Sequence, residues 1–277
     1  MIASIILVAL IVPVMVCMTL DPPPRKGILR IIGGVAAEKG QLPYVVSLQI
    51  QRNPGHFCTG TLLDATTVLT AAHCIVGAKQ AGYDASKIVV QAGSLSRSSG
   101  GVVAKVSYAV IPPAYTTATY AGDVGVLKLR SPIAAGPGIG FAELARKGSD
   151  PTAGTMVTAA GWGNSYSGDD DGTEDLRTVD VPVVSRKECN ALYKAQGQEG
   201  QEFPIVTKDM ICAGYIDDYE NGKDSCHGDS GGPLVDKETG LVVGVVSWGP
   251  EGCGTDGFVG VYAGVGQLRT FIDRYRN

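Results

Sequence analysis

Many short runs rich in β-branched and other apolar residues limit most strongly how this chain folds. Glycine and proline separate the runs, and the chain supplies 38 glycines and 15 prolines among 277 residues. Runs of this kind, bounded by turn residues, predict β-strands joined by tight turns, so we expect an all-β fold. The runs include Val45–Gln51, Val68–Ala72, Lys87–Gly93, Val102–Ile111, Val124–Leu129, Thr155–Gly161, Leu176–Val184, Met210–Ala213, Leu241–Trp248 and Val259–Tyr262.

The segment Val265–Tyr275 has a different period. Its apolar residues fall on one helical face, which predicts an amphipathic helix near the C-terminus. They are Val265, Leu268, Phe271, Ile272 and Tyr275. Ser131–Asp150 is rich in glycine, alanine and proline, and we expect it to join two halves of the fold.

The first thirty residues are expected to be removed and not to form part of the folded domain. Ile2 to Met18 is apolar and uncharged, which is typical of a secretory signal peptide. A membrane anchor is the alternative, because the run is close to the minimum length for a span, and lipidation of Cys17 is another. We assign residues 1–20 to the signal and residues 21–30, a polar segment stiffened by prolines, to a propeptide.

Charge and composition exclude several function classes. Lys and Arg number 23 against 27 Asp and Glu, so there is no basic field for nucleic acid. The acidic run from Asp169 to Asp175 lacks EF-hand spacing and is typical of a solvated loop. We expect no metal and no cofactor.

Cysteine usage indicates export. The chain has seven cysteines, and one of them, Cys17, lies in the predicted signal. The six that remain are an even number, as expected for a disulfide framework in an oxidising compartment. Their spacing leaves all fifteen possible pairings open.

Three short segments carry groups suited to nucleophilic catalysis. They are TAAHC around His73, DVGVL starting at Asp123, and CHGDSGGP around Ser230. A serine hydroxyl becomes a strong nucleophile only when a base takes its proton, and the chain offers three histidines for that role. In this order the three segments resemble those of the trypsin/chymotrypsin serine proteases, and the resemblance extends from Ile31 to Asn277.

The resemblance implies a fold and a disulfide pattern. The fold is two packed six-stranded antiparallel β-barrels with a C-terminal helix, over residues 31–277. The N-terminal barrel spans about 31–145 and the C-terminal barrel about 146–277, with the active site between them. The implied disulfides are Cys58–Cys74, Cys189–Cys212 and Cys226–Cys253.

The resemblance also implies catalytic roles. His73 is the general base, Asp123 orients its ring, and Ser230 attacks the peptide carbonyl. The backbone N–H groups of Gly228 and Ser230 form the oxyanion hole. The ordinary alternatives are a structural histidine, a turn aspartate, a turn serine and a turn glycine.

Substrate choice depends on Asp224, six residues before Ser230. By resemblance it forms the floor of the primary pocket and favours Arg or Lys before the cleaved bond. The alternative is a solvated loop aspartate. The other expected substrate-binding residues are Ser225, Ser247, Trp248, Gly249 and Gly260.

The junction between Arg30 and Ile31 resembles the activation site of a zymogen. Cleavage there would create an amine on Ile31 that pairs with Asp229, and such a buried pair locks a conformation. His56 resembles a histidine that holds this aspartate in some zymogens, although a packed strand histidine is an equal alternative.

These expectations describe a secreted, monomeric zymogen that cleaves protein or peptide substrates after Arg or Lys. Protein protease inhibitors are expected partners, and no stable membrane association is expected after processing. The alternative from another class is a catalytically silent homologue that acts as a binding module.

Overall fold

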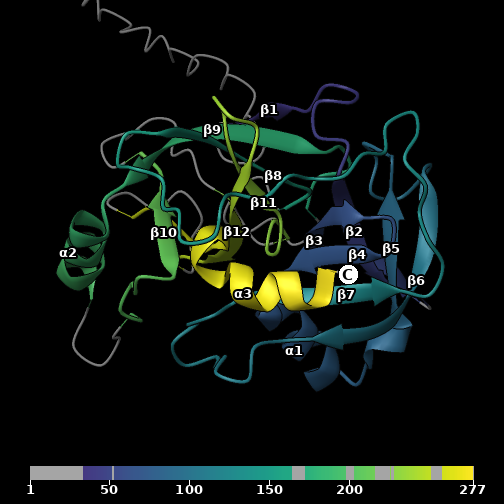
Figure 1. Ribbon diagram of the computed structural model, residues 1–277, viewed down its shortest axis with the longest axis horizontal. Coiled ribbons are helices and arrows are strands. Elements are labelled where there is room, and N and C mark those ends of the chain that lie inside the picture. Colours follow the sequence, from purple (N-terminus) through teal and green to yellow (C-terminus); the bar gives the residue numbers. More distant parts are fainter. Residues whose placement is uncertain are drawn as a thin grey trace, which may run out of the picture.

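The computed structural model describes residues 34–51, 53–163, 172–197, 203–215, 225, 228–250 and 258–276 (Figure 1). The strands are β1 (Val35–Ala36), β2 (Val45–Ile50), β3 (Asn53–Asp64), β4 (Thr67–Thr70), β5 (Ile88–Ala92), β6 (Val102–Val110), β7 (Gly125–Leu129), β8 (Met156–Gly161), β9 (Arg177–Val184), β10 (Met210–Ala213), β11 (Pro233–Asp236), β12 (Val242–Trp248) and β13 (Gly260–Gly264). The helices are α1 (Ala72–Gln80), the short 3₁₀ turn η1 (Ala85–Lys87), α2 (Arg186–Gln196) and α3 (Val265–Arg276).

The strands form two closed antiparallel barrels, which confirms the predicted fold class. The first barrel has the order β2-β3-β4-β7-β6-β5. The second has the order β9-β10-β13-β12-β11-β8, and β8 pairs with β9 to close it. Closure leaves neither barrel with an unpaired edge, while β1 adds to β9 from outside.

The alternation of side chains builds the first barrel. In β2, Val46 and Leu48 point into the core, while Ser47 and Gln49 point to the opposite face. The main hydrophobic cluster continues from this barrel into Val242 and Val245 of the second, so part of the core is shared. The second barrel also has a cluster of its own, which includes Val181 and Leu234.

The connection between β7 and β8 runs from the first barrel to the second through residues 131–150. It is fixed on the way, because the N–H of Ala145 donates to the carbonyl of Val242 at 3.0 Å and the N–H of Val242 donates to the carbonyl of Glu143 at 2.9 Å. The predicted bridging segment is therefore held along β12.

The C-terminal helix α3 packs across both barrels (Figure 1). Its Val265 and Ile272 lie in the shared core. The carbonyl of Arg276 accepts a hydrogen bond from Thr67 Oγ1 at 3.1 Å, and the Arg276 guanidinium donates to the carbonyl of Leu63 at 3.1 Å. The end of α3 is thus fastened to the first barrel.

The sequence prediction differs from the structure in several elements. The strand expected at Val68–Ala72 ends at Thr70, and Ala72 begins α1, a helix that the sequence pattern does not predict. Strands β1, β3 and β11 and helix α2 were also not singled out. The pairing of β3 with β2 and β4 contains register shifts, which obscure the simple alternation that marks a strand.

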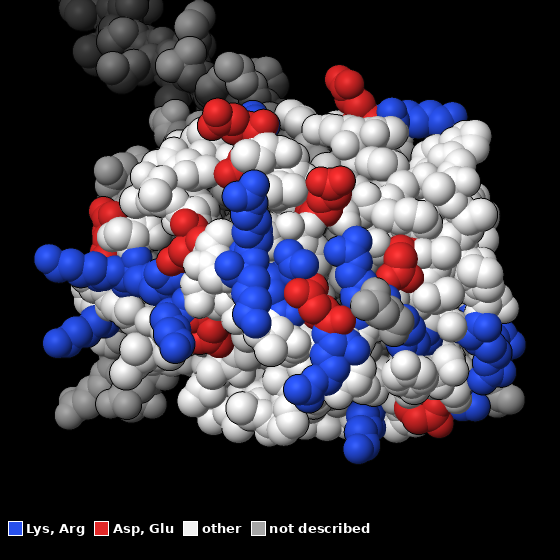
Figure 2. All heavy atoms as spheres, in the orientation of Figure 1, with Lys and Arg blue, Asp and Glu red and all other residues white. Residues whose placement is uncertain are grey.

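Among the residues that the structure describes, no helix is long and apolar enough to cross a membrane. The run Ile2–Met18, residues 21–30 and the acidic run from 169 to 171 lie outside the described residues. On the face that carries α3, basic and acidic side chains are interspersed (Figure 2). This face has no single-sign field of the kind that binds nucleic acid.

Candidate active site

His73 and Asp123 form the centre of the site. His73 lies in the first turn of α1, and Asp123 lies just before β7. The carboxylate accepts two hydrogen bonds from His73, one from Nδ1 to Oδ2 at 2.7 Å and one from the backbone N–H to Oδ1 at 2.9 Å. Ser247 on β12 donates a third, from Oγ to Oδ2 at 2.5 Å. Asp123 is fully buried, so these donors replace the water that its charge has lost.

Ser230 lies in the turn before β11. The disulfide sulfur of Cys74 lies between this residue and His73. Cys74 Sγ is 3.7 Å from His73 Nε2 and 3.6 Å from the carbonyl oxygen of Ser230. The N–H of Thr59 on β3 donates to that same carbonyl at 2.8 Å. Among the described residues, no hydrogen bond joins Ser230 Oγ to His73. Such contacts often tighten only when substrate is bound.

The turn that carries Ser230 depends on two glycines. Gly228 has a φ of +98° and Gly231 a φ of +81°, a region that residues with side chains avoid. A Cβ on Gly231 would lie 2.1 Å from Thr70 Oγ1. The turn leaves the N–H groups of Gly228 and Ser230 without an acceptor among the described residues.

His56 holds the carbonyl of the same turn. Its Nε2 lies 2.8 Å from the carbonyl oxygen of Gly228, and its Nδ1 lies 2.9 Å from Ser47 Oγ. Burial, with a smaller effect of the nearby Arg97 charge, lowers the pKa of His56 to about 4, although the bond to Gly228 opposes the shift. His56 is therefore neutral at pH 7. Both ring nitrogens are engaged, as in a packed strand histidine.

Asp229 is buried beside the second barrel. Its Oδ1 accepts a hydrogen bond from the N–H of Gly163 at 2.8 Å. A Cβ on Gly161 would lie 2.2 Å from the same oxygen, so glycine is required for this close approach. The expected partner of Asp229, Ile31, and the preceding Arg30 lie outside the described residues.

The expected substrate-binding residues are only partly described. Ser225 Oγ lies 3.3 Å from Tyr262 Oη. Gly249 is exposed with open space around it, and Gly260 is buried in β13 opposite Ala213. Trp248 packs on Tyr193 with ring centroids 4.9 Å apart. Asp224 lies outside the described residues.

The side chain of Ser247, a residue expected to bind substrate, donates its hydroxyl hydrogen to Asp123. This contact could not be predicted from sequence, because the two residues are 124 positions apart. Its backbone belongs to β12.

Two further residues at the site were not predicted. Tyr120 has a φ of +53°, and its ring centroid lies 6.1 Å from that of His73 and 6.2 Å from that of Trp248. Burial, with a smaller effect of the Asp123 charge, raises the pKa of Tyr120. Asp209, from the second barrel, accepts a hydrogen bond at 2.7 Å from the N–H of Gly122, the residue that directly precedes Asp123.

The disulfides Cys58–Cys74 and Cys189–Cys212 are formed, with Cα–Cα distances of 6.3 and 6.4 Å. The first ties β3 to α1 next to His73. The pair Cys226–Cys253 lies outside the described residues. Over the described ranges, one group is compact enough to hold a metal ion, and it consists of Cys58, His73 and Cys74. Both of its sulfurs are bonded to each other in the disulfide and are therefore not available as ligands.

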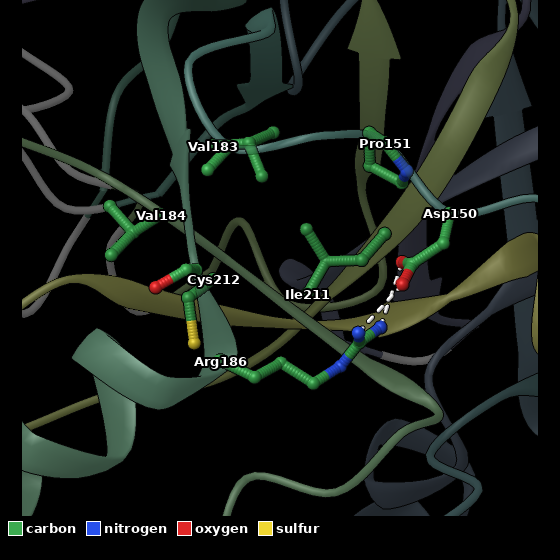
Figure 3. Close-up of a pocket in the computed structure, with 9 residues that line it drawn as sticks. Asp150, Pro151, Val183, Val184, Arg186, Ile211 and Cys212 are labelled. Atoms are coloured by element: carbon green, nitrogen blue, oxygen red, sulfur yellow. Dashed lines mark hydrogen bonds and ion pairs between the residues drawn. The ribbon is translucent and has the colours of Figure 1, made fainter.

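A separate cavity of about 190 Å³ lies beside β9 and β10 (Figure 3). Arg186 reaches across it and binds Asp150 through two hydrogen bonds of 2.6 and 2.7 Å. The same guanidinium donates to the carbonyls of Thr207, Lys208 and Met210. The charged groups of this cavity therefore satisfy each other, and the arrangement is structural.

Comparison with known proteins gives one consistent result. The family model described as Trypsin matches residues 31–272. "Trypsin Blo t 3" from Blomia tropicalis is 37% identical over 243 residues, which cover 87% of this chain and 84% of that relative. "Trypsin alpha" from Drosophila melanogaster is 37% identical and "Trypsin 5G1" from Aedes aegypti is 37% identical, each over 88% of this chain and over 86% and 84% of the relative.

Proposed function

Because the chain belongs to the trypsin family of serine endopeptidases, we propose that His73, Asp123 and Ser230 are its catalytic triad and that it cleaves protein chains after Arg or Lys. The observation that carries the proposal is the contact between His73 Nδ1 and the buried Asp123 carboxylate. That carboxylate accepts the Nδ1 proton, so the lone pair of Nε2 is directed away from it, toward the disulfide that Ser230 also approaches.

In the proposed reaction, His73 Nε2 takes the proton of Ser230 Oγ as the oxygen attacks the substrate carbonyl. The imidazolium that forms is stabilised by Asp123. The negative charge on the former carbonyl oxygen is bound by the N–H groups of Gly228 and Ser230. His73 then gives its proton to the leaving amine. Water next attacks the acyl-enzyme with the same proton transfers through His73, which releases the acid and restores Ser230.

The proposed specificity for Arg or Lys rests on Asp224, because this residue lies six positions before Ser230. A buried carboxylate attracts a substrate cation and leaves neutral side chains without a partner. Ser225 and Tyr262, whose hydroxyls lie 3.3 Å apart, are placed to add polar contacts. Gly249 and Gly260 keep the pocket walls free of side chains.

We further propose that the protein is a secreted zymogen, activated when the bond between Arg30 and Ile31 is cut. The chain just after this bond is anchored, because Arg177 Nη2 donates to the carbonyl of Gly34 at 2.7 Å and β1 pairs with β9. A new amine on Ile31 would pair with Asp229, which is buried and directly precedes Ser230. A monomer that protein protease inhibitors recognise fits the same proposal.

The proposal is tested with the processed protein and a fluorophosphonate label, which reacts with an activated serine. Ser230→Ala should abolish labelling and nearly all turnover, whereas Ser149→Ala, at an exposed serine remote from the site, should leave both unchanged. Labelling that persists in Ser230→Ala would overturn the triad.

The finer proposals need two additional measurements. Peptide p-nitroanilides that end in Arg should react far faster than those that end in Phe, and Asp224→Ser should remove this preference. Equal rates for Arg and Phe would contradict the specificity. N-terminal sequencing of active enzyme should begin Ile-Ile-Gly-Gly, and an active species that retains Arg30 would contradict the activation step.

A further inference from the structure

We propose that Gln49 is a positioning residue for catalysis, which acts on the Gly228 peptide through a relay of hydrogen bonds formed with Gln91, Ser47 and His56. The inference rests on the proposed function of the Ser230 turn. It adds a second set of residues, on the outer face of the first barrel, that the triad and the substrate pocket do not include.

The register of the first barrel brings these residues together. Strand β2 lies between β3 and β5 (Figure 1). Ser47 is directly opposite Gln91 on β5, and Gln49 is directly opposite His56 on β3. Ser47 and Gln49 are two residues apart, so they share the face of β2 that points away from the core.

This face is unusual because its polar side chains are buried. Ser47 is 1% exposed, Gln91 5% and Gln49 6%. Buried amides and hydroxyls are costly unless they are hydrogen-bonded. Here the loop of residues 94–101 covers them and supplies backbone carbonyls as partners.

The carbonyls of this loop fix the orientation of the two glutamine amides. Gln91 Nε2 faces the carbonyls of Ser99 at 3.0 Å and Gly100 at 2.9 Å, which can only accept. Gln91 must therefore turn its Oε1 toward Gln49, whose Nε2 donates to it at 2.7 Å. Gln49 Nε2 also faces the carbonyl of Arg97 at 2.7 Å, which fixes the same amide orientation.

The relay then continues to the turn before β11. Gln49 Nε2 lies 3.1 Å from Ser47 Oγ, the longest of its three contacts. The carbonyl of Gly228 can only accept, so neutral His56 donates to it from Nε2 and its Nδ1 must accept from Ser47. Gln49 Nε2 has two hydrogens for three acceptors, so Ser47 Oγ shares a hydrogen with a second acceptor, and this shared bond keeps the hydroxyl hydrogen turned toward Nδ1.

The relay matters for the reaction because of where it ends. Gly228 has a φ of +98°, and its N–H is a proposed oxyanion donor. Among the described residues, the side chains of His56 and Thr59 hold its carbonyl, at 2.8 and 3.0 Å. Fixing the carbonyl fixes the rotation of the peptide that follows Gly228, and so the direction of the neighbouring donors.

The loop end of the relay is also anchored. The hydroxyls of Ser96 and Ser98 donate to Glu174 Oε1 at 2.5 and 2.6 Å, and the N–H of Arg97 donates to the Glu174 carbonyl at 2.9 Å. Glu174 belongs to the segment before β9 of the second barrel. The relay therefore starts from a loop that both barrels hold.

The experiment compares Gln49→Met with wild type and with Gln51→Met, a matched control. Gln51 is exposed and lines the same cavity of about 420 Å³ as Gln49 and Gln91, but it is not part of the relay. For Gln49→Met we expect kcat to fall about tenfold with little change in KM, because loosening a donor costs less than the 10²–10³ typical of deleting one. Gln51→Met should match wild type.

Two inhibitors show whether the loss is at the oxyanion site. A peptide aldehyde adds to the catalytic serine and places its oxygen in the oxyanion hole, whereas the matching peptide alcohol does not. Gln49→Met should weaken the aldehyde about tenfold and leave the alcohol unchanged, since the lost interaction belongs to the transition state. Equal weakening of both, no weakening of the aldehyde, or an equal effect of Gln51→Met would overturn the proposal.

A readout without turnover separates this inference from the proposed function. With ¹⁵N-labelled histidine in a Ser230→Ala background, the three histidines of the chain give few signals to assign. His56 should be the Nε2–H tautomer, and both Gln49→Met and Ser47→Ala should move its Nδ1 resonance toward that of an imidazole without a donor. If Gln49→Met does not fold, Ser47→Ala decides, and an unchanged Nδ1 signal overturns the relay even if wild type labels normally.

Discussion

Asp209 should control activity from across the barrel interface. Its carboxylate accepts hydrogen bonds from the N–H of Gly122 at 2.7 Å and from Thr207 Oγ1 at 2.5 Å. Gly122 has a φ of +70° and directly precedes Asp123. Asp209→Ala removes the acceptor that holds this residue, and with it one constraint on the position of the proposed triad carboxylate.

The magnitude follows from the kind of bond that is lost. A hydrogen bond to a charged group contributes about 1.5–3 kcal/mol, and because Asp209 is only half-buried we expect the lower end, about 1.5 kcal/mol. At about 2–4 °C per kcal/mol for a protein of this size, Tm should fall by about 3–6 °C. A similar loss in the transition state lowers kcat/KM about tenfold.

The assay measures Tm and kcat/KM for Asp209→Ala beside Asp236→Ala. Asp236 is a matched control, because its carboxylate accepts from the N–H groups of Glu238 and Thr239 in a surface turn. Both variants should lose stability, but only Asp209→Ala should lose activity. If Asp209→Ala kept full kcat/KM at a lowered Tm, the bond to Gly122 would be purely structural and the reasoning refuted.

Two further predictions concern pH and packing. Because burial lowers the pKa of His56 to about 4, the unfolded chain binds this proton more readily, so its contribution to stability is full above about pH 6.5 and is lost as pH falls toward 4. His56→Gln should flatten the slope of unfolding free energy in this window, measured by urea titration, and an identical slope would contradict the assignment. Gly161→Ala places a Cβ 2.2 Å from Asp229 Oδ1 and should lower both Tm and activity. Gly77→Ala, at an exposed helical position with open space, should raise stability by about 0.5–1 kcal/mol, and similar Tm changes for the two variants would argue against the contact.

The sequence was a good guide wherever the information is local. The runs that became β2, β5 and β9 show clear β patterning, and the period of Val265–Tyr275 predicts α3 to within one residue at its end. Motif order also brought attention to His73, Asp123 and Ser230 before any geometry was known.

The contacts that position those residues are not local and could not be predicted. Asp209 and Gly122 are 87 residues apart, and Gln49 and Gln91 are 42 apart. Single glutamines and aspartates carry no periodic signal, and their burial follows only from the closure of the barrels. Helix α1 was missed for a related reason, since its apolar residues form no marked stripe.

The placement of β1 and α3 has a consequence for how the molecule is made. β1 precedes the first barrel in the chain but pairs with β9 of the second, and α3 follows the second barrel but is fastened to Thr67 and Leu63 of the first. A ribosome therefore releases all the strands of the first barrel before the helix that finishes it exists. Each half is therefore completed by an element from the other end of the chain, and we expect a nascent chain truncated before Val265 to be less stable than the full chain.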